Sequence, residues 1–161
     1  VFQHLEVDVD NGPIHEVAEL FRNSPFTLYN ESHEAVKRVK HLGLKTAIAT
    51  STPKPFFIKG LGHIESLIDF VCTGYEAGYE KSNPQIYKVI TDRLDMEPSE
   101  TVVIGDNPVL DIANSKKHGM KAIQIVREGA PSEQADGTAR NVLEAVKLIE
   151  HWVQSGAPAG I

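Results

Sequence analysis

The chain has 161 residues, a net charge of −6, and 41% hydrophobic and 24% charged residues. This composition is typical of a globular domain with a sizeable core, and the negative charge argues against nucleic acid as the main partner. Because the sequence shows neither a signal peptide nor an apolar run long enough to span a bilayer, we expect a cytoplasmic protein with no membrane partner.

Residues 1–28 differ in pattern from the rest of the chain. They predict the end of a helix, an acidic loop over 6–12, and a second helix that begins at Pro13 and ends before Pro25. We therefore treat them as a segment separate from the domain that follows.

From residue 29 to residue 154, helices alternate with strands. The hydrophobic periodicity predicts helices over 31–42, 54–68, 84–94, 112–118 and 141–154, and strands over 44–50, 69–73, 102–104 and 121–126. We expect an irregular stretch over 74–83, a polar loop over 128–139 and a flexible tail over 155–161. This alternation predicts an α/β fold, with a mostly parallel sheet and helices on both of its faces.

Two acids follow the strand over 102–104. Gly105 and Asp106 end that strand, and Asp111 comes five positions later. Open α/β folds bind their ligands at the carboxyl ends of the strands, and paired acids without a thiol or clustered histidines suit Mg²⁺. Asn107 could support such a cation without ligating it. The same residues also fit an ordinary turn and a helix cap.

Polar residues elsewhere are expected at the same edge of the sheet. The strand over 44–50 ends in Thr50 and Ser51, and right-handed crossovers bring this end beside Asp106. Hydroxyls and free N–H groups there can hold a phosphate oxygen, although a plain turn would look the same. Lys81 could balance phosphate charge and hold a nucleophilic carboxylate, or it could be a surface lysine.

The order and spacing of these residues resemble the haloacid dehalogenase-like (HAD) superfamily of hydrolases. The family's second motif is an apolar strand that ends in Ser or Thr, as at Thr50. Its third is a lysine in a Gly-x-x-Lys setting, as in residues 78–84. Its fourth is Gly-Asp-x-x-x-x-Asp, as in residues 105–111. The resemblance covers roughly residues 28–150.

This resemblance implies a Rossmann-like core over 29–154 and Mg²⁺-dependent phosphotransfer. Thr50 would bind the transferring phosphoryl group, and Lys81 would stabilise the nucleophile and the phosphate charge. Asp106 would ligate Mg²⁺, and Asp111 would support the ligand set. We expect a phosphatase for a small phosphorylated metabolite that works through an aspartyl-phosphate.

The family's first motif, Asp-x-Asp-x-Thr, has no good match. The only candidate is residues 8–12, where the preceding segment is too polar for a central strand and Gly12 replaces Thr. In one interpretation, residues 1–28 are the end of a helical cap, and the nucleophile lies upstream of Val1. In the other, Asp8 and Asp10 are a degenerate first motif.

The missing motif leaves other functions open. A chain without its nucleophile could be a catalytically silent fragment or a binding module. Other chemistries of the superfamily, such as phosphomutase or haloacid dehalogenase, are further alternatives. The acidic fourth motif favours a phosphatase over a dehalogenase, because dehalogenation needs no cation.

Overall fold

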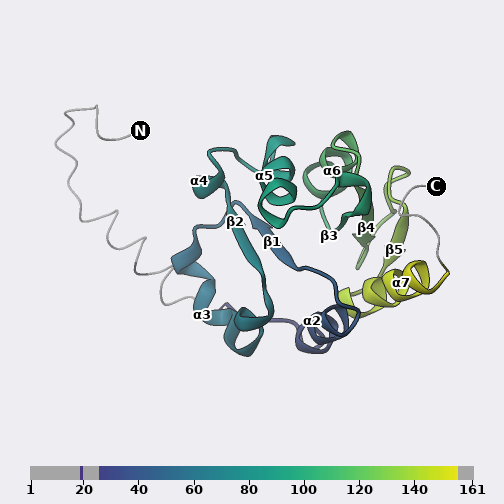
Figure 1. Ribbon diagram of the computed structural model, residues 1–161, viewed down its shortest axis with the longest axis horizontal. Helices are drawn as coiled ribbons and strands as arrows, with labels where there is room; N and C mark the ends of the chain where they lie inside the picture. The colour runs from purple at the N-terminus through teal and green to yellow at the C-terminus, as the bar shows by residue number, and fades with distance from the viewer. Residues whose placement is uncertain (1–18, 20–25, 156–161) are drawn as a thin grey trace.

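The computed structural model describes residue 19 and residues 26–155 (Figure 1). The expected cap segment over 1–28 and the tail over 155–161 lie almost wholly outside the described residues. Asp8 and Asp10 lie outside them as well.

Short helices and strands alternate along the described chain. In order they are α2 (Ser32–His41), β1 (Ala47–Thr50), η2 (Lys54–Phe56), α3 (Ile58–Leu61), η3 (Gly62–Leu67), β2 (Phe70–Thr73), α4 (Gly74–Ala77), α5 (Gln85–Leu94), η4 (Pro98–Glu100), β3 (Val102–Gly105), η5 (Pro108–Ala113), α6 (Asn114–Lys117), β4 (Lys121–Ile125), β5 (Gly137–Ala139) and α7 (Val142–Gln154).

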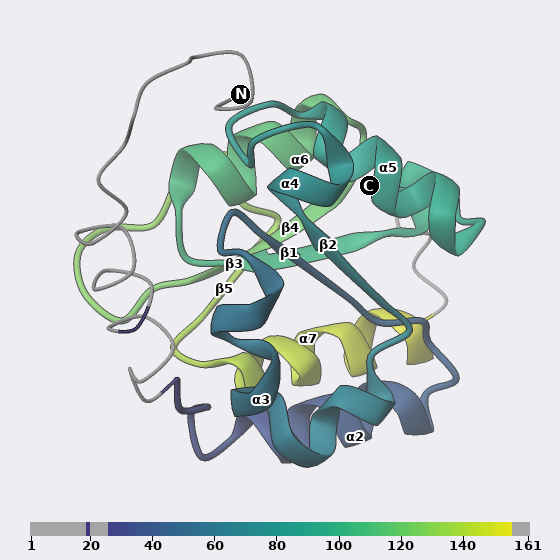
Figure 2. The same ribbon diagram turned by 90° about the vertical axis from the view of Figure 1, so that its left-hand side faces the viewer.

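The described strands pair in parallel. β1 pairs with β2, with Ala47 opposite Phe70, while β4 lies between β3 and β5, with Val102 opposite Lys121. The helices form two layers: Figure 2 shows α2, α3 and α7 on one side of the strands and α4, α5 and α6 on the other. The expected α/β fold class is confirmed.

Three apolar clusters hold these layers together. One joins β2 to α5 through Cys72, Ile86 and Tyr87, each at most 1% exposed. A second joins β4 and β5 to α7, and the third lies around α3. Cys72 is a free, buried thiol.

Three expectations about local structure are wrong. The stretch over 74–83, expected to be irregular, contains the helix α4, which Thr73 caps by accepting a hydrogen bond from Glu76 N. The expected polar loop over 128–139 contains the edge strand β5, which has no alternating apolar pattern. Its position depends on tertiary contacts: Asp136 accepts a hydrogen bond from Ala122 N at 2.7 Å, and α7 packs over Gly137.

The expected helix over 54–68 is divided into η2, α3 and η3. Phe57, with a φ of −126°, separates η2 from α3, and Gly62, with a left-handed φ of 52°, separates α3 from η3.

Candidate active site

The loop after β3 is organised by Asn107 and Asp111. The Asn107 side chain accepts hydrogen bonds from Val109 N at 3.0 Å and Leu110 N at 2.9 Å, and so caps η5. The Asp111 carboxylate reaches back and accepts from Asn107 N at 3.1 Å. Position 105 must be glycine, because a Cβ there would clash with the Asp111 carboxyl group.

Asp111 is a buried carboxylate paired with Lys81. Asp111 is 1% exposed, and Lys81 Nζ lies 2.6 Å from its Oδ1 atom. Burying a carboxylate is costly unless an opposite charge neutralises it, and Lys81 supplies that charge. Within the described residues Oδ1 accepts no directed hydrogen bond, so the contact is mainly electrostatic.

Asn114 positions the loop that carries Lys81. Its side-chain amide donates to Ser82 O at 3.0 Å and, more weakly, to Lys81 O at 3.4 Å. Asn114 is 3% exposed and lies at the start of α6. The sequence analysis did not single out this residue for a role at the site. The signal available was a polar pair, Asn114 and Ser115, on the buried face of a helix.

Tyr87 of α5 supports the same region from the core. Its hydroxyl donates to Leu110 O at 2.7 Å, next to Asp111. Burial, and secondarily the charge of Asp111, raises the pKa of Tyr87, so the hydroxyl stays a neutral donor. The sequence analysis missed Tyr87 because it lies beside the expected apolar stripe of its helix.

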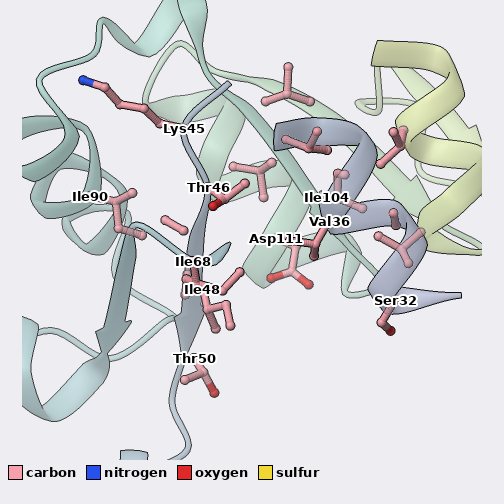
Figure 3. A pocket seen from close by; sticks show the side chains of 18 of the residues that line it. Ser32, Val36, Lys45, Thr46, Ile48, Thr50, Ile68, Ile90, Ile104 and Asp111 are labelled. Atoms are coloured by element: carbon pink, nitrogen blue, oxygen red, sulfur yellow. The ribbon is translucent and has the colours of Figure 1, made fainter. Parts of the chain in front are cut away.

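Three of the predicted site residues line one cavity of about 560 Å³: Thr50, Lys81 and Asp111. Figure 3 shows Thr50 at the end of β1, with Asp111 across the cavity from that strand. Thr50 Oγ1 accepts from Thr52 N at 3.0 Å, which leaves its hydroxyl hydrogen available to a ligand.

The other three predicted residues, Ser51, Asp106 and Asn107, are exposed and do not line this cavity. Asp106 still directly follows β3, and its backbone carbonyl accepts a hydrogen bond from Gln124 Nε2 at 3.3 Å.

Asp106 and Asp111 are suitable oxygen donors for a hard cation. Mg²⁺ is commonly bound by one or two carboxylates and completed by water and substrate oxygens. Among the residues that the structure describes, no cluster of three or more His, Cys, Asp or Glu side chains exists. Asp111 already contacts Lys81 through Oδ1 and Asn107 N through Oδ2, so the exposed Asp106 carboxylate is the group that fits Mg²⁺ as a direct ligand, with Asp111 beside the loop that carries it.

A model of the haloacid dehalogenase-like hydrolase family matches residues 2–119. The chain belongs to this family. The resemblance inferred from residues 78–84 and 105–111 is thereby confirmed. In the described part of this HAD-like chain, no helix has the length and hydrophobicity needed to cross a bilayer.

Similar proteins include hydrolases and phosphatases. The HAD-like chain is 26% identical over 141 residues to the mouse haloacid dehalogenase-like hydrolase domain-containing protein 3, covering 80% of this chain and 56% of that protein. It is 32% identical over 97 residues to the bovine phospholysine phosphohistidine inorganic pyrophosphate phosphatase, covering 55% of this chain and 36% of that protein. The chain thus spans about half or less of these relatives.

Among solved structures, a HAD phosphatase from Thermococcus onnurineus matches with a TM-score of 0.73 and 26% identity. The match covers 92% of this chain and 68% of that one. The fold is therefore shared over nearly the whole HAD-like chain, while about a third of the neighbour has no counterpart in it.

Proposed function

We propose that this HAD-like chain is the core of a Mg²⁺-dependent phosphatase for a small phosphorylated metabolite. The observation that carries the proposal is the meeting of Thr50, Lys81 and Asp111 at one cavity beside the carboxyl ends of β1 and β3. A hydroxyl donor, a cation and a carboxylate in this arrangement suit phosphoryl transfer, which depends mainly on positioning and charge neutralisation. The phosphatases among the relatives support the same choice.

In this proposal each residue has a separate task. The Thr50 hydroxyl donates to a phosphoryl oxygen, and Lys81 balances the negative charge of the phosphate and of the nucleophile. Asp106 ligates Mg²⁺, and Asp111 supports the ligand set. The exposed Ser51 helps to bind the phosphate, and the exposed Asn107 lies beside the cation without ligating it. The bound cation would supply charge neutralisation on the phosphoryl oxygens. The nucleophilic carboxylate comes from a segment outside the described residues.

Cation binding tests this assignment without requiring turnover. We expect Asp106→Asn to weaken Mg²⁺ binding, measured by calorimetry, by at least about tenfold, because a direct carboxylate ligand becomes a neutral amide. Asp95→Asn is the matched control, since Asp95 is exposed and lies at the end of α5, outside the site. Equal Mg²⁺ affinity in the two variants would rule out Asp106 as a ligand.

A catalytically silent binding module is the second candidate. It is favoured by one observation: among the described residues, the carboxylate paired with Lys81 is Asp111, which is buried and also bonded to Asn107 N. A silent module would bind Mg²⁺ and inorganic phosphate but would not hydrolyse p-nitrophenyl phosphate.

A further inference from the structure

Gln124 is a polar residue buried in the middle strand of the β3–β4–β5 group. It lies in β4, opposite Gly105 of β3 on one side and Thr138 of β5 on the other (Figure 1). Its neighbours Ala122 and Ile123 are apolar and fully buried, and Gln124 itself is 5% exposed. A buried amide is costly unless its hydrogen bonds are made, so packing alone does not account for a glutamine at this position.

Each end of the Gln124 amide binds a backbone group. Its Nε2 atom donates to Asp106 O at 3.3 Å, and its Oε1 atom accepts from Ser132 N at 2.6 Å. A glutamine amide has a donor at one end and an acceptor at the other, so turning it over would lose both bonds. Ser132, which lies in the loop between β4 and β5, therefore fixes the orientation of the amide that faces Asp106.

The peptide group between Asp106 and Asn107 is held at both of its polar atoms. Its carbonyl oxygen accepts from Gln124, and its N–H donates to Asp111 Oδ2 at 3.1 Å. Both partner side chains are buried, so water competes little for these bonds. Because a peptide group is planar, two bonds at its opposite edges fix its rotation about the chain.

That rotation fixes the backbone from which the Asp106 side chain extends. The Asp106 carboxylate is exposed and makes no hydrogen bond or ion pair within the part of the chain that the structure describes. Its direction therefore depends on the backbone at residue 106 and not on a side-chain partner. A ligand that is already held in position loses less conformational freedom when it binds an ion.

We propose that Gln124 is a positioning residue for Asp106: it holds the peptide group between residues 106 and 107, and so preorganises the Asp106 carboxylate for a divalent cation. This inference rests on the proposed function, in which Asp106 ligates Mg²⁺, and it extends that function to a residue of the neighbouring strand. Gln124 acts through the backbone, because both ends of its amide are already engaged by Asp106 O and Ser132 N.

Mg²⁺ titrations followed by NMR test this role. Gln124→Met keeps the length of the side chain and removes both hydrogen bonds, so we expect Mg²⁺ affinity to fall about fivefold, the loss typical of one hydrogen bond. Thr91→Val is the matched control. Thr91 is 2% exposed, and its hydroxyl donates to Tyr87 O and Lys88 O within α5, so its loss should leave Mg²⁺ affinity unchanged.

A double variant separates positioning from a general loss of stability. In Asp106→Asn the proposed ligand is gone, so adding Gln124→Met should weaken Mg²⁺ binding no further. The proposal is overturned if the two losses add in the double variant, or if folded Gln124→Met binds Mg²⁺ as tightly as the wild type.

Ser132→Pro gives the same test from outside the strand, should Gln124→Met fail to fold. Proline has no N–H, so this variant removes the bond that orients the Gln124 amide and leaves β4 intact. We expect Mg²⁺ affinity to fall about twofold, since the amide can still reach Asp106 O in one of its two orientations. Wild-type Mg²⁺ affinity in Ser132→Pro would count against the proposal.

The protein without Mg²⁺ distinguishes this proposal from the proposed function. Exchange of the Asn107 amide hydrogen should accelerate about fivefold in Gln124→Met, because the freed peptide group releases Asp111 more often. Unchanged Asn107 exchange overturns the role of Gln124. If Asn107 exchange accelerates but Asp106→Asn binds Mg²⁺ as tightly as the wild type, Gln124 holds the peptide group as inferred, and the proposed function is what fails.

Discussion

Lys81 Nζ and Asp111 Oδ1 lie 2.6 Å apart and join the loop before α5 to η5 after β3. Asp111 is buried, while Lys81 keeps about a quarter of its side chain exposed. Only the lysine of this ion pair is therefore in contact with solvent. This contact links two motifs that are thirty positions apart in the sequence. It therefore connects the stability of the domain to the integrity of the site.

Lys81→Met should destabilise the chain by about 2 kcal/mol, because it leaves the Asp111 carboxylate buried without a counter-charge. The value is below that for a fully buried pair, since Lys81 is partly solvated. Urea denaturation measures the free energy of unfolding. The double variant Lys81→Met with Asp111→Asn should recover part of the loss, because the buried charge is then gone. Additive losses in the double variant would contradict this coupling.

Tyr87→Phe should cost about 1 kcal/mol at neutral pH, because Leu110 O loses its donor inside the core. The raised pKa of Tyr87 also predicts a pH effect. The unfolded tyrosine releases its proton above its ordinary pKa of 10.0, while the folded one holds it. This contribution to stability is therefore complete below pH 10 and is lost as the pH rises above it.

Denaturation of wild type and Tyr87→Phe between pH 8 and pH 11 checks this sign. The difference in unfolding free energy between them should shrink above about pH 10. Tyr75→Phe is the control, because Tyr75 is 91% exposed and should show no such change. A difference that stays constant with pH would show that the Tyr87 hydroxyl does not titrate differently on folding.

Asn114→Ala should loosen the Lys81 loop, because the carbonyls of Lys81 and Ser82 lose their donor. Amide exchange over residues 79–83 should accelerate several-fold, in line with a loss of about 1 kcal/mol. Asn114→Asp should be worse than Asn114→Ala, since it places a carboxylate against carbonyl oxygens. If amide exchange over residues 79–83 is the same in the wild type and in both variants, the Asn114 hydrogen bonds do not hold this loop in place.

Asp69 predicts an acid-dependent loss of stability. It binds Lys40 Nζ at 2.7 Å and accepts from Thr46 N at 2.6 Å, and these bonds, that to Lys40 foremost, lower the pKa of Asp69. The stabilisation is therefore complete above the ordinary pKa of 3.8 and is lost as the pH falls through the lower folded value.

Asp69→Asn should cost roughly 1 kcal/mol at pH 7, and the cost should fade below about pH 4. The estimate is small because the Lys40 pair is solvent-exposed. Asp92→Asn is the control, since Asp92 has an exposed i,i+4 pair with Lys88 and should change stability little at either pH. If Asp69→Asn and Asp92→Asn behave alike at pH 7, Asp69 has no special role.

Local pattern in the sequence was sufficient for the α/β class and for most elements. α5 and α7 agree with the apolar spacing of their residues, because one buried face at helical period is visible in the sequence. β5 was missed since three residues, Gly137 to Ala139, carry no such pattern and pair with β4 only through contacts made by distant parts of the chain.

For the candidate site, the sequence determined the residue types and their order, and these were enough to indicate the family. The tertiary structure alone decided which of them meet. It brings Thr50, Lys81 and Asp111 to one cavity and leaves Ser51, Asp106 and Asn107 exposed. It also adds Asn114 and Tyr87, which hold the loops around the site through hydrogen bonds to Ser82 O and Leu110 O. The physical reason is that burial, ion pairing and strand pairing join residues far apart in the chain, which no local pattern encodes.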